Sequence, residues 1–129
     1  MFELTINDNT YQFNFGMGFL REIDPTVTKP IDGIKGKVQN LGLQYAVAGI
    51  IDKDVMTLAD VLVRANKGLN PRLTVSEVEA YIEDDRTDID RLFDDVLGFL
   101  KSANVTKNTT QTMIEAVEAE KAKAATENT

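Results

Sequence analysis

The chain has 129 residues, of which 43% are hydrophobic and 27% are charged, a composition typical of one globular domain. It contains no cysteine and no histidine. This excludes disulfides, thiol catalysis, and histidine as a general base or metal ligand. The formal net charge of −7 repels phosphate backbones, so we expect no nucleic-acid binding.

The start of the chain lacks the basic and apolar regions of a signal peptide. The longest apolar run, LGLQYAVAGII at 41–51, is too short to cross a bilayer. We therefore expect a cytoplasmic protein that has no membrane association.

The first segment, FELTINDNTYQFNF at 2–15, alternates apolar and polar residues and predicts a β-hairpin. A turn at Asp8-Asn9 places six apolar side chains on one face. The expected pairs are Ile6 with Tyr11, Leu4 with Phe13, and Phe2 with Phe15. We expect this face to pack on helices, and the free edges of the hairpin are candidates for self-association.

Helical periodicity follows at 15–24, and Pro25 ends this helix. Residues 25–37 are rich in Pro, Gly and Lys and are interpreted as a connecting loop. Residues 38–52 are apolar on nearly all sides and predict a central buried helix. Small residues at helical spacing on it allow a close helix neighbour, from this chain or from another. They are Gly42, Ala46 and Gly49.

Three further helices are predicted from periodicity and capping residues. One covers 57–69. Thr74 and Glu77 form a capping box that opens the next. Thr87 and Asp90 are expected to start a third helix, whose apolar stripe has the clearest period in the chain. That stripe is Ile89, Leu92, Phe93, Val96, Leu97 and Leu100.

The remaining segment begins with the polar stretch TKNTTQT, interpreted as a spacer before a last helical stretch. Beyond about Ala119 no side chain is suited to burial, so fraying or disorder is expected there. We predict a single folded domain at 1–105, and a helical or partly disordered tail at 106–129. The expected fold is mainly α (α+β), with the N-terminal hairpin packed on five to six helices.

The stretch from Glu77 to Asp95 carries nine acidic residues and two arginines. It lacks the central glycine and the closing glutamate of a calcium loop, so no metal site is predicted. A solvated helix surface is the simplest interpretation. The alternative is a docking face for a basic partner, formed by Asp84, Asp85, Asp88 and Asp90.

No catalytic pattern was found. The glycines in FGMGF follow no buried parallel strand, so they do not indicate a phosphate-binding loop. Paired carboxylates could act on glycosides, but the chain has no tryptophan for a sugar platform. We predict a non-enzymatic protein without a cofactor.

Several blocks of sequence, taken in order, resemble a known family. These are the leading hairpin, FGMGFLREID, GLQYAVAGIIDKDVMTLADVLVRAN, and RLTVSEVEAYIEDDRTDIDRLFDDVLGFLKSANVTKNT. In this order they resemble the tail assembly chaperones of long-tailed (siphovirus-type) phages and prophages of Gram-positive bacteria.

The resemblance implies a protein that forms homo-oligomers, including spiral ones, and that coats and solubilises the tape measure protein. It implies action in the host cytoplasm during tail morphogenesis and absence from the mature virion. It further implies recruitment of the tail tube protein, mainly by a C-terminally extended form made by ribosomal frameshifting.

Two alternatives stay open on the sequence alone. An acidic helical inhibitor that mimics DNA would use the four aspartates of the acidic stretch. A structural tail or connector subunit would stay in the particle.

Overall fold

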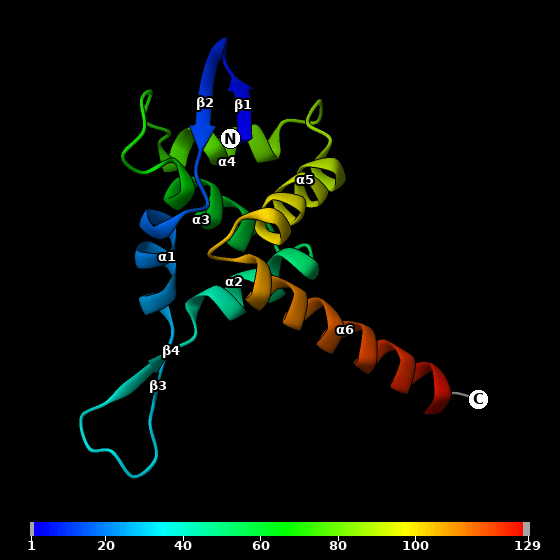
Figure 1. Ribbon diagram of the computed structural model, residues 1–129. Helices are drawn as coiled ribbons and strands as arrows, with labels where there is room; N and C mark the ends of the chain where they lie inside the picture. Colours follow the sequence, from blue (N-terminus) through cyan, green and yellow to red (C-terminus); the bar gives the residue numbers. More distant parts are fainter. Residues whose placement is uncertain (1, 128–129) are drawn as a thin grey trace.

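In the computed structural model, the described residues 2–127 form six α-helices, one short 3-10 helix and two separate two-stranded antiparallel sheets. The strands are β1 Phe2–Ile6, β2 Asn9–Phe13, β3 Thr28–Pro30 and β4 Val38–Asn40. The helices are α1 Met17–Ile23, the 3-10 helix η1 Asp24–Thr26, α2 Gly42–Ile51, α3 Val55–Asn66, α4 Val75–Glu83, α5 Ile89–Ser102 and α6 Lys107–Glu127. Figure 1 shows the first hairpin and the second strand pair at opposite ends of the molecule. The predicted mainly α fold with an N-terminal hairpin is confirmed.

The N-terminal hairpin has a different register from the one expected. Its turn is at Asn7-Asp8, and Phe2 therefore faces Phe13 instead of Phe15. Asn7 and Asp8 have φ angles of 52° and 67°, the left-handed values that a type I′ turn requires. The predicted turn at Asp8-Asn9 is wrong. Because the register differs by two residues, the same side chains still share one face.

The apolar face of the hairpin packs on the helices. The Phe2 ring lies 5.4 Å from that of Phe13 and 4.9 Å from that of Phe99 in α5. Just beyond β2, the Asn14 amide donates a hydrogen bond to the Ala65 carbonyl oxygen in α3, at 2.9 Å. A two-stranded sheet is marginal on its own in water, so these helix contacts account for its stability.

A buried polar side chain also joins the hairpin to the helices. Asn66, at the end of α3, is fully buried. Its amide nitrogen donates to the Gln12 carbonyl oxygen at 3.0 Å and to that of Pro71 at 3.1 Å. Its amide oxygen accepts from the Leu73 backbone amide at 2.6 Å. The one side chain therefore connects β2, α3 and the segment that leads into α4.

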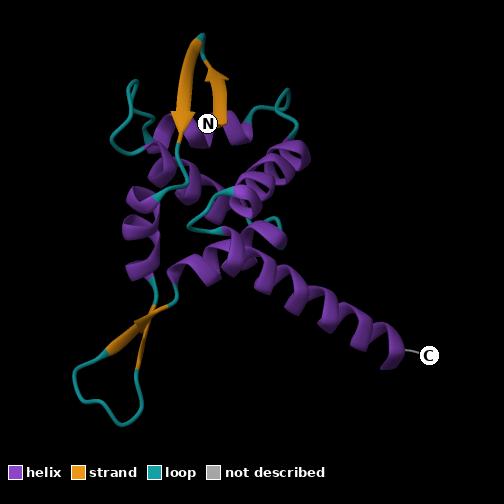
Figure 2. Ribbon diagram, in the orientation of Figure 1, coloured by secondary structure: helices purple, strands orange, loops and turns teal. Residues whose placement is uncertain are grey.

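The segment interpreted as a loop contains an unexpected second ribbon. Residues 38–40, expected to begin the central helix, form β4 and pair with β3. α2 begins only at Gly42, after a hydrogen bond from the Leu41 amide to the Val27 carbonyl oxygen. Figure 2 shows the ribbon as a separate pair of strands that projects from the helices. Val38 to Asn40 are exposed, and their pairing with β3 accounts for the extended conformation.

The predicted helix starts around α4 and α5 are partly confirmed. The Thr74–Glu77 capping box is present, with both reciprocal hydrogen bonds. The predicted cap at Thr87 is wrong, because Asp88 caps α5 by accepting from the Arg91 amide at 3.1 Å. The Thr87 hydroxyl instead donates to the Tyr81 carbonyl oxygen at 2.7 Å, closing the loop between α4 and α5.

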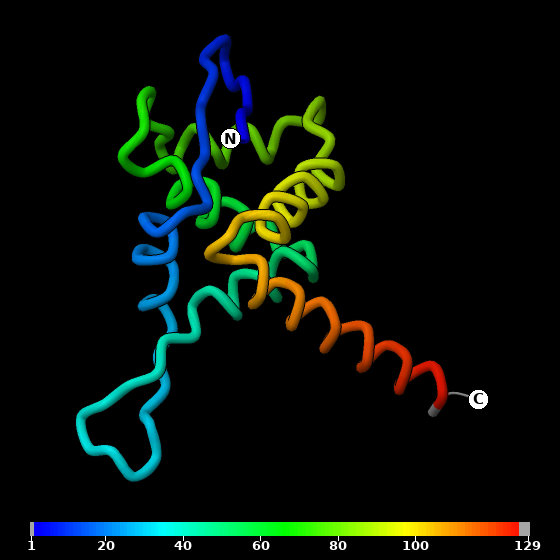
Figure 3. The backbone as a smooth tube through the Cα atoms, viewed as in Figure 1, coloured from blue at the N-terminus to red at the C-terminus, as the bar shows by residue number. Residues whose placement is uncertain are grey.

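The polar stretch TKNTTQT is not a spacer, since most of it belongs to α6. Thr106 and Thr110 are fully buried, and their hydroxyls donate to the carbonyl oxygens of Leu100 and Thr106. The first turns of α6 pack on α2 and α5. Figure 3 shows the rest of α6 extending away from the other helices. The predicted division at residues 105/106 stays a prediction.

The end of α6 is helical where fraying or disorder was expected. The helix runs past Ala119 to Glu127, although every side chain described after Val117 is exposed. Residues 128–129 of the predicted tail lie outside the described residues.

Phe13→Asp tests the packing of the hairpin. Phe13 is only 1% exposed, so the substitution buries a charge among aromatic rings. We expect the free energy of unfolding to fall by about 2–4 kcal/mol, measured by urea denaturation. Thr10→Asp, at an exposed position on the same strand that faces the uncharged Thr5, is the control. An unchanged midpoint for Phe13→Asp would show that this face is open to water.

Candidate interaction surfaces

The face of the hairpin is buried within the monomer. Phe2, Ile6, Tyr11, Phe13 and Phe15 are all buried. Leu4 is half-buried and packs at the edge of the core. Phe15 lies beyond β2, and its ring makes a T-shaped contact with that of Phe19 in α1. The hairpin was also predicted to self-associate through its edges. The outer edges of β1 and β2 pair with no other strand within residues 2–127.

The small residues of α2 lie against segments of the same chain. A side chain at Gly42 would overlap the carbonyl oxygens of Ile23 and Asp24, and one at Gly49 would overlap Thr57. Ala46, between them on the helix, is buried. These positions therefore allow α2 to approach η1 and the start of α3 closely.

The four aspartates of the predicted docking face mostly have structural partners. Arg86 binds Asp84 through its guanidinium and backbone amide, which lowers the pKa of Asp84 to about 2. Asp88 caps α5. Asp90 pairs with Lys53 at 3.0 Å. Asp85 is exposed and forms no ion pair with the described part of the chain. The acidic stretch thus consists largely of helix caps and local ion pairs.

One acid of this stretch connects α4 to the hairpin. The Tyr11 hydroxyl donates to the Glu77 carboxylate at 2.6 Å, while Glu77 also completes the capping box with Thr74. The bond from Tyr11, and then those from Thr74, lower the pKa of Glu77 below its ordinary value of 4.5. The pKa of Tyr11 is raised in turn, first by its bond to Glu77. The cap of α4 and the position of β2 are therefore coupled.

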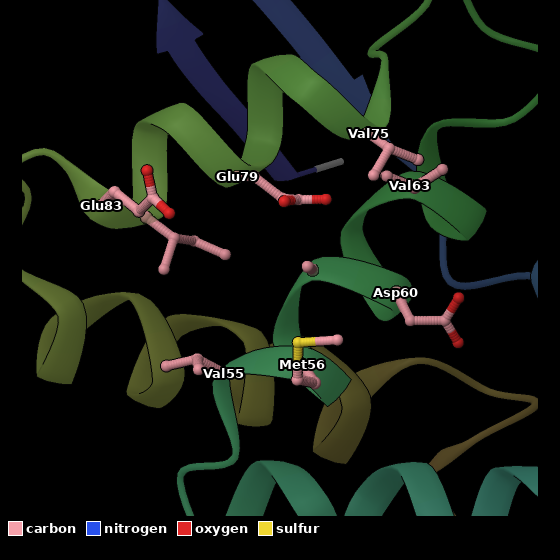
Figure 4. A pocket seen from close by; sticks show the side chains of 9 residues that line it. Val55, Met56, Asp60, Val63, Val75, Glu79 and Glu83 are labelled. Atoms are coloured by element: carbon pink, nitrogen blue, oxygen red, sulfur yellow. The ribbon is translucent and has the colours of Figure 1, made fainter.

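A groove between α3 and α4, with a volume of about 310 Å³, has a mainly apolar lining. Figure 4 shows the side chains of both helices around it. We call it the α3–α4 groove. Its lining residues are Val55, Met56, Ala59, Asp60, Val63, Val75, Glu79, Ile82 and Glu83. The side chain of Met56 is 77% exposed and that of Val75 54% exposed. Six lining residues are apolar and three are acidic.

Sequence reasoning missed this groove, although a signal was present. The predicted helix at 57–69 began too late to include Val55 and Met56, which open α3. With Ala59 and Val63 they form a second apolar stripe at helical spacing, beside the buried stripe of Leu58, Val61, Leu62 and Ala65. A helix with two apolar stripes needs a packing partner for each. The structure buries the stripe of Leu58, Val61, Leu62 and Ala65, and it leaves Val55 and Met56 of the other stripe exposed.

A second exposed surface is the β3–β4 ribbon, which we call the arm and define as residues 28–40. Every residue of it is exposed. They include three large apolar side chains, Ile31, Ile34 and Val38. Contiguous exposed apolar side chains of this kind are typical of contact surfaces.

No group of acidic residues arranged to hold a metal ion occurs within residues 2–127. No helix among the described residues is long and apolar enough to cross a membrane.

The groove and the arm give this mainly helical protein two exposed surfaces that carry apolar side chains. The chain belongs to the phage tail assembly chaperone (TAC) family, whose model matches residues 3–115. The match covers the hairpin, the arm, α2 to α5 and the packed start of α6. No curated protein and no solved structure shows significant similarity to the chain.

Tyr11→Phe tests the bond between the hairpin and α4 through its pH dependence. Because the pKa of Glu77 is lowered in the folded protein, its bonds stabilise the fold above pH 4.5. This contribution is lost as the pH falls through the folded pKa. We expect Tyr11→Phe to lower the urea midpoint at pH 7, and the difference from wild type to shrink below pH 4.5.

The matched control is Tyr81→Phe, at a half-buried tyrosine whose hydroxyl has no hydrogen-bond partner in residues 2–127. A difference between Tyr11→Phe and wild type that stays constant with pH would contradict the coupling.

Proposed function

We propose that this protein is a tail assembly chaperone of a long-tailed phage or prophage of a Gram-positive host. In this role it multimerises, coats the tape measure protein and keeps that protein soluble until tail tube subunits polymerise around it. The observation that carries the proposal is the family match over residues 3–115.

The surfaces of the molecule support binding as the mode of action. A chaperone that coats a long helical client needs exposed apolar surface to receive it and a charged exterior to keep the complex in solution. The α3–α4 groove and the arm supply exposed apolar side chains, and the net charge of −7 supplies the exterior. Many weak contacts, repeated along a multimer, give a high total affinity for a repetitive client.

In this proposal the protein acts in the cytoplasm of the host, without a cofactor or a catalytic step. A C-terminally extended form recruits the tail tube protein. The exposed end of α6 supports this part of the proposal, because a domain joined there would not disturb the packed core.

The DNA-mimic alternative is not favoured by the acidic residues. Asp84, Asp88 and Asp90 are engaged by Arg86, the start of α5 and Lys53 respectively. A mimic of the DNA backbone needs free charges at regular spacing.

Co-expression with the tape measure protein of the same phage tests the proposal. We expect the tape measure protein to be insoluble alone, and to become soluble and co-purify with this chain. An acidic helical protein of similar size, expressed in its place, is the control. If the tape measure protein stays in the pellet with both partners, the proposed function is wrong.

Mass spectrometry of purified virions separates the chaperone from a structural tail or connector subunit. A chaperone is expected in the infected cell lysate and absent from the virions. Stoichiometric recovery of this chain from virions would establish the structural alternative instead.

A further inference from the structure

The arm has a composition unlike that of the rest of the chain. It carries Lys29, Lys35 and Lys37 against the single acid Asp32, within a protein whose net charge is −7. None of these lysines forms an ion pair with another described residue. The arm is therefore a basic element, and its lysines lack partners within the monomer.

The apolar side chains of the arm are also only partly covered within the monomer. Ile34 and Val38 are 52% and 55% exposed. A two-stranded ribbon with no hydrophobic cover is marginally stable in water. Surface burial against another molecule would stabilise both the ribbon and the contact.

The α3–α4 groove has the complementary features. Its apolar lining includes the exposed Val55, Met56 and Val75, and two acids of α4 line it as well. These acids, Glu79 and Glu83, are exposed and form no ion pair with residues 2–127. The groove thus presents apolar side chains with unpaired negative charge, and the arm presents apolar side chains with unpaired positive charge.

The arm of one chain projects away from its own α4. Figure 1 shows the arm and α4 at opposite ends of the molecule, with α1 and α2 between them. We propose that the arm of one copy docks into the α3–α4 groove of the next copy through its isoleucines and lysines. The inference rests on the multimer of the proposed function and identifies its contact surfaces.

This contact is heterologous, because two different surfaces of the chain meet. Repeating such a contact produces a ring where the rotation closes and an open spiral where it does not. The charge complementarity makes association salt-sensitive, since surface ion pairs are screened at high ionic strength. Burial of the apolar side chains is less affected by salt.

Charge reversal tests the contact. The arm variant is Lys35→Glu with Lys37→Glu, and the groove variant is Glu79→Lys with Glu83→Lys. Each replaces attraction by repulsion, so we expect each to weaken self-association at least about tenfold in sedimentation velocity. An equimolar mixture of the two variants is expected to reassemble, since each arm then meets a groove of opposite charge. A single chain that carries all four substitutions is expected to assemble like wild type.

Matched controls lie on the exposed part of α6. Lys121→Glu with Lys123→Glu changes the net charge as much as the arm variant does. Glu118→Lys with Glu120→Lys does the same for the groove variant. Both controls are expected to assemble like wild type. Circular dichroism and the urea midpoint of every variant establish that it is folded before its assembly is interpreted.

Three results would overturn the inference: a wild type that stays monomeric at high concentration, variants that assemble normally, or folded variants that fail to reassemble on mixing. Co-purification of the tape measure protein is measured with the same variants. A groove variant that assembles normally but loses the tape measure protein would assign the groove to that client instead. If the arm–groove contact is overturned but the wild type still co-purifies with the tape measure protein, the proposed chaperone function stands. The two failures are therefore distinguishable.

Discussion

The buried side-chain amide of Asn66 is the constraint on which the arrangement of this protein depends. Three hydrogen bonds join it to the carbonyl oxygens of Gln12 and Pro71 and to the amide of Leu73. A buried backbone group that loses its partner costs about 1–3 kcal/mol. This one side chain satisfies such a group, the Leu73 amide, together with two part-buried carbonyl oxygens. It therefore fixes the end of α3 against β2 and sets where the chain turns towards α4. The Tyr11–Glu77 bond then holds the start of α4 to the same hairpin.

The position of α3 and α4 determines what is left exposed. One stripe of α3, including Leu58 and Leu62, is buried in the core. The other stripe faces the groove, where Met56 of α3 is 77% exposed and Val75 of α4 is 54% exposed. The hairpin thus contributes to function indirectly: its buried face holds two helices at a separation that leaves a groove. The arm, at the far end of the molecule, has the opposite charge. A chain with complementary surfaces at its two ends is suited to repetitive assembly, as a chaperone that coats a long client requires.

Local chemistry made much of the fold predictable from the sequence, and the errors have physical reasons. Alternation identified the hairpin, and the Thr74–Glu77 pair identified the start of α4. The hairpin register could not be settled, because two turns of Asn and Asp, two residues apart in register, preserve the same alternation. The ribbon was missed because three-residue strands carry almost no periodic signal. The role of Asn66 depends on contacts between segments far apart in the chain, which no local pattern records. The groove was missed because the predicted helix began after Val55 and Met56. The acidic stretch suggested a docking face because the sequence shows only its excess charge. The ion pairs of Asp84 with Arg86 and of Asp90 with Lys53 depend on the folded structure.

Disulfide trapping between copies tests the head-to-tail contact most directly, because the chain has no cysteine of its own. Disulfides form only between residues whose Cα atoms come within about 7 Å, so Ile34→Cys with Met56→Cys probes one contact between arm and groove. On mild oxidation this double variant is predicted to give a ladder of covalent dimers, trimers and longer species on a non-reducing gel. Ile34→Cys with Lys101→Cys, which places the second cysteine on α5 outside the groove, should give dimers at most. Absence of the ladder from the first variant, or an equal ladder from the second, would contradict the account.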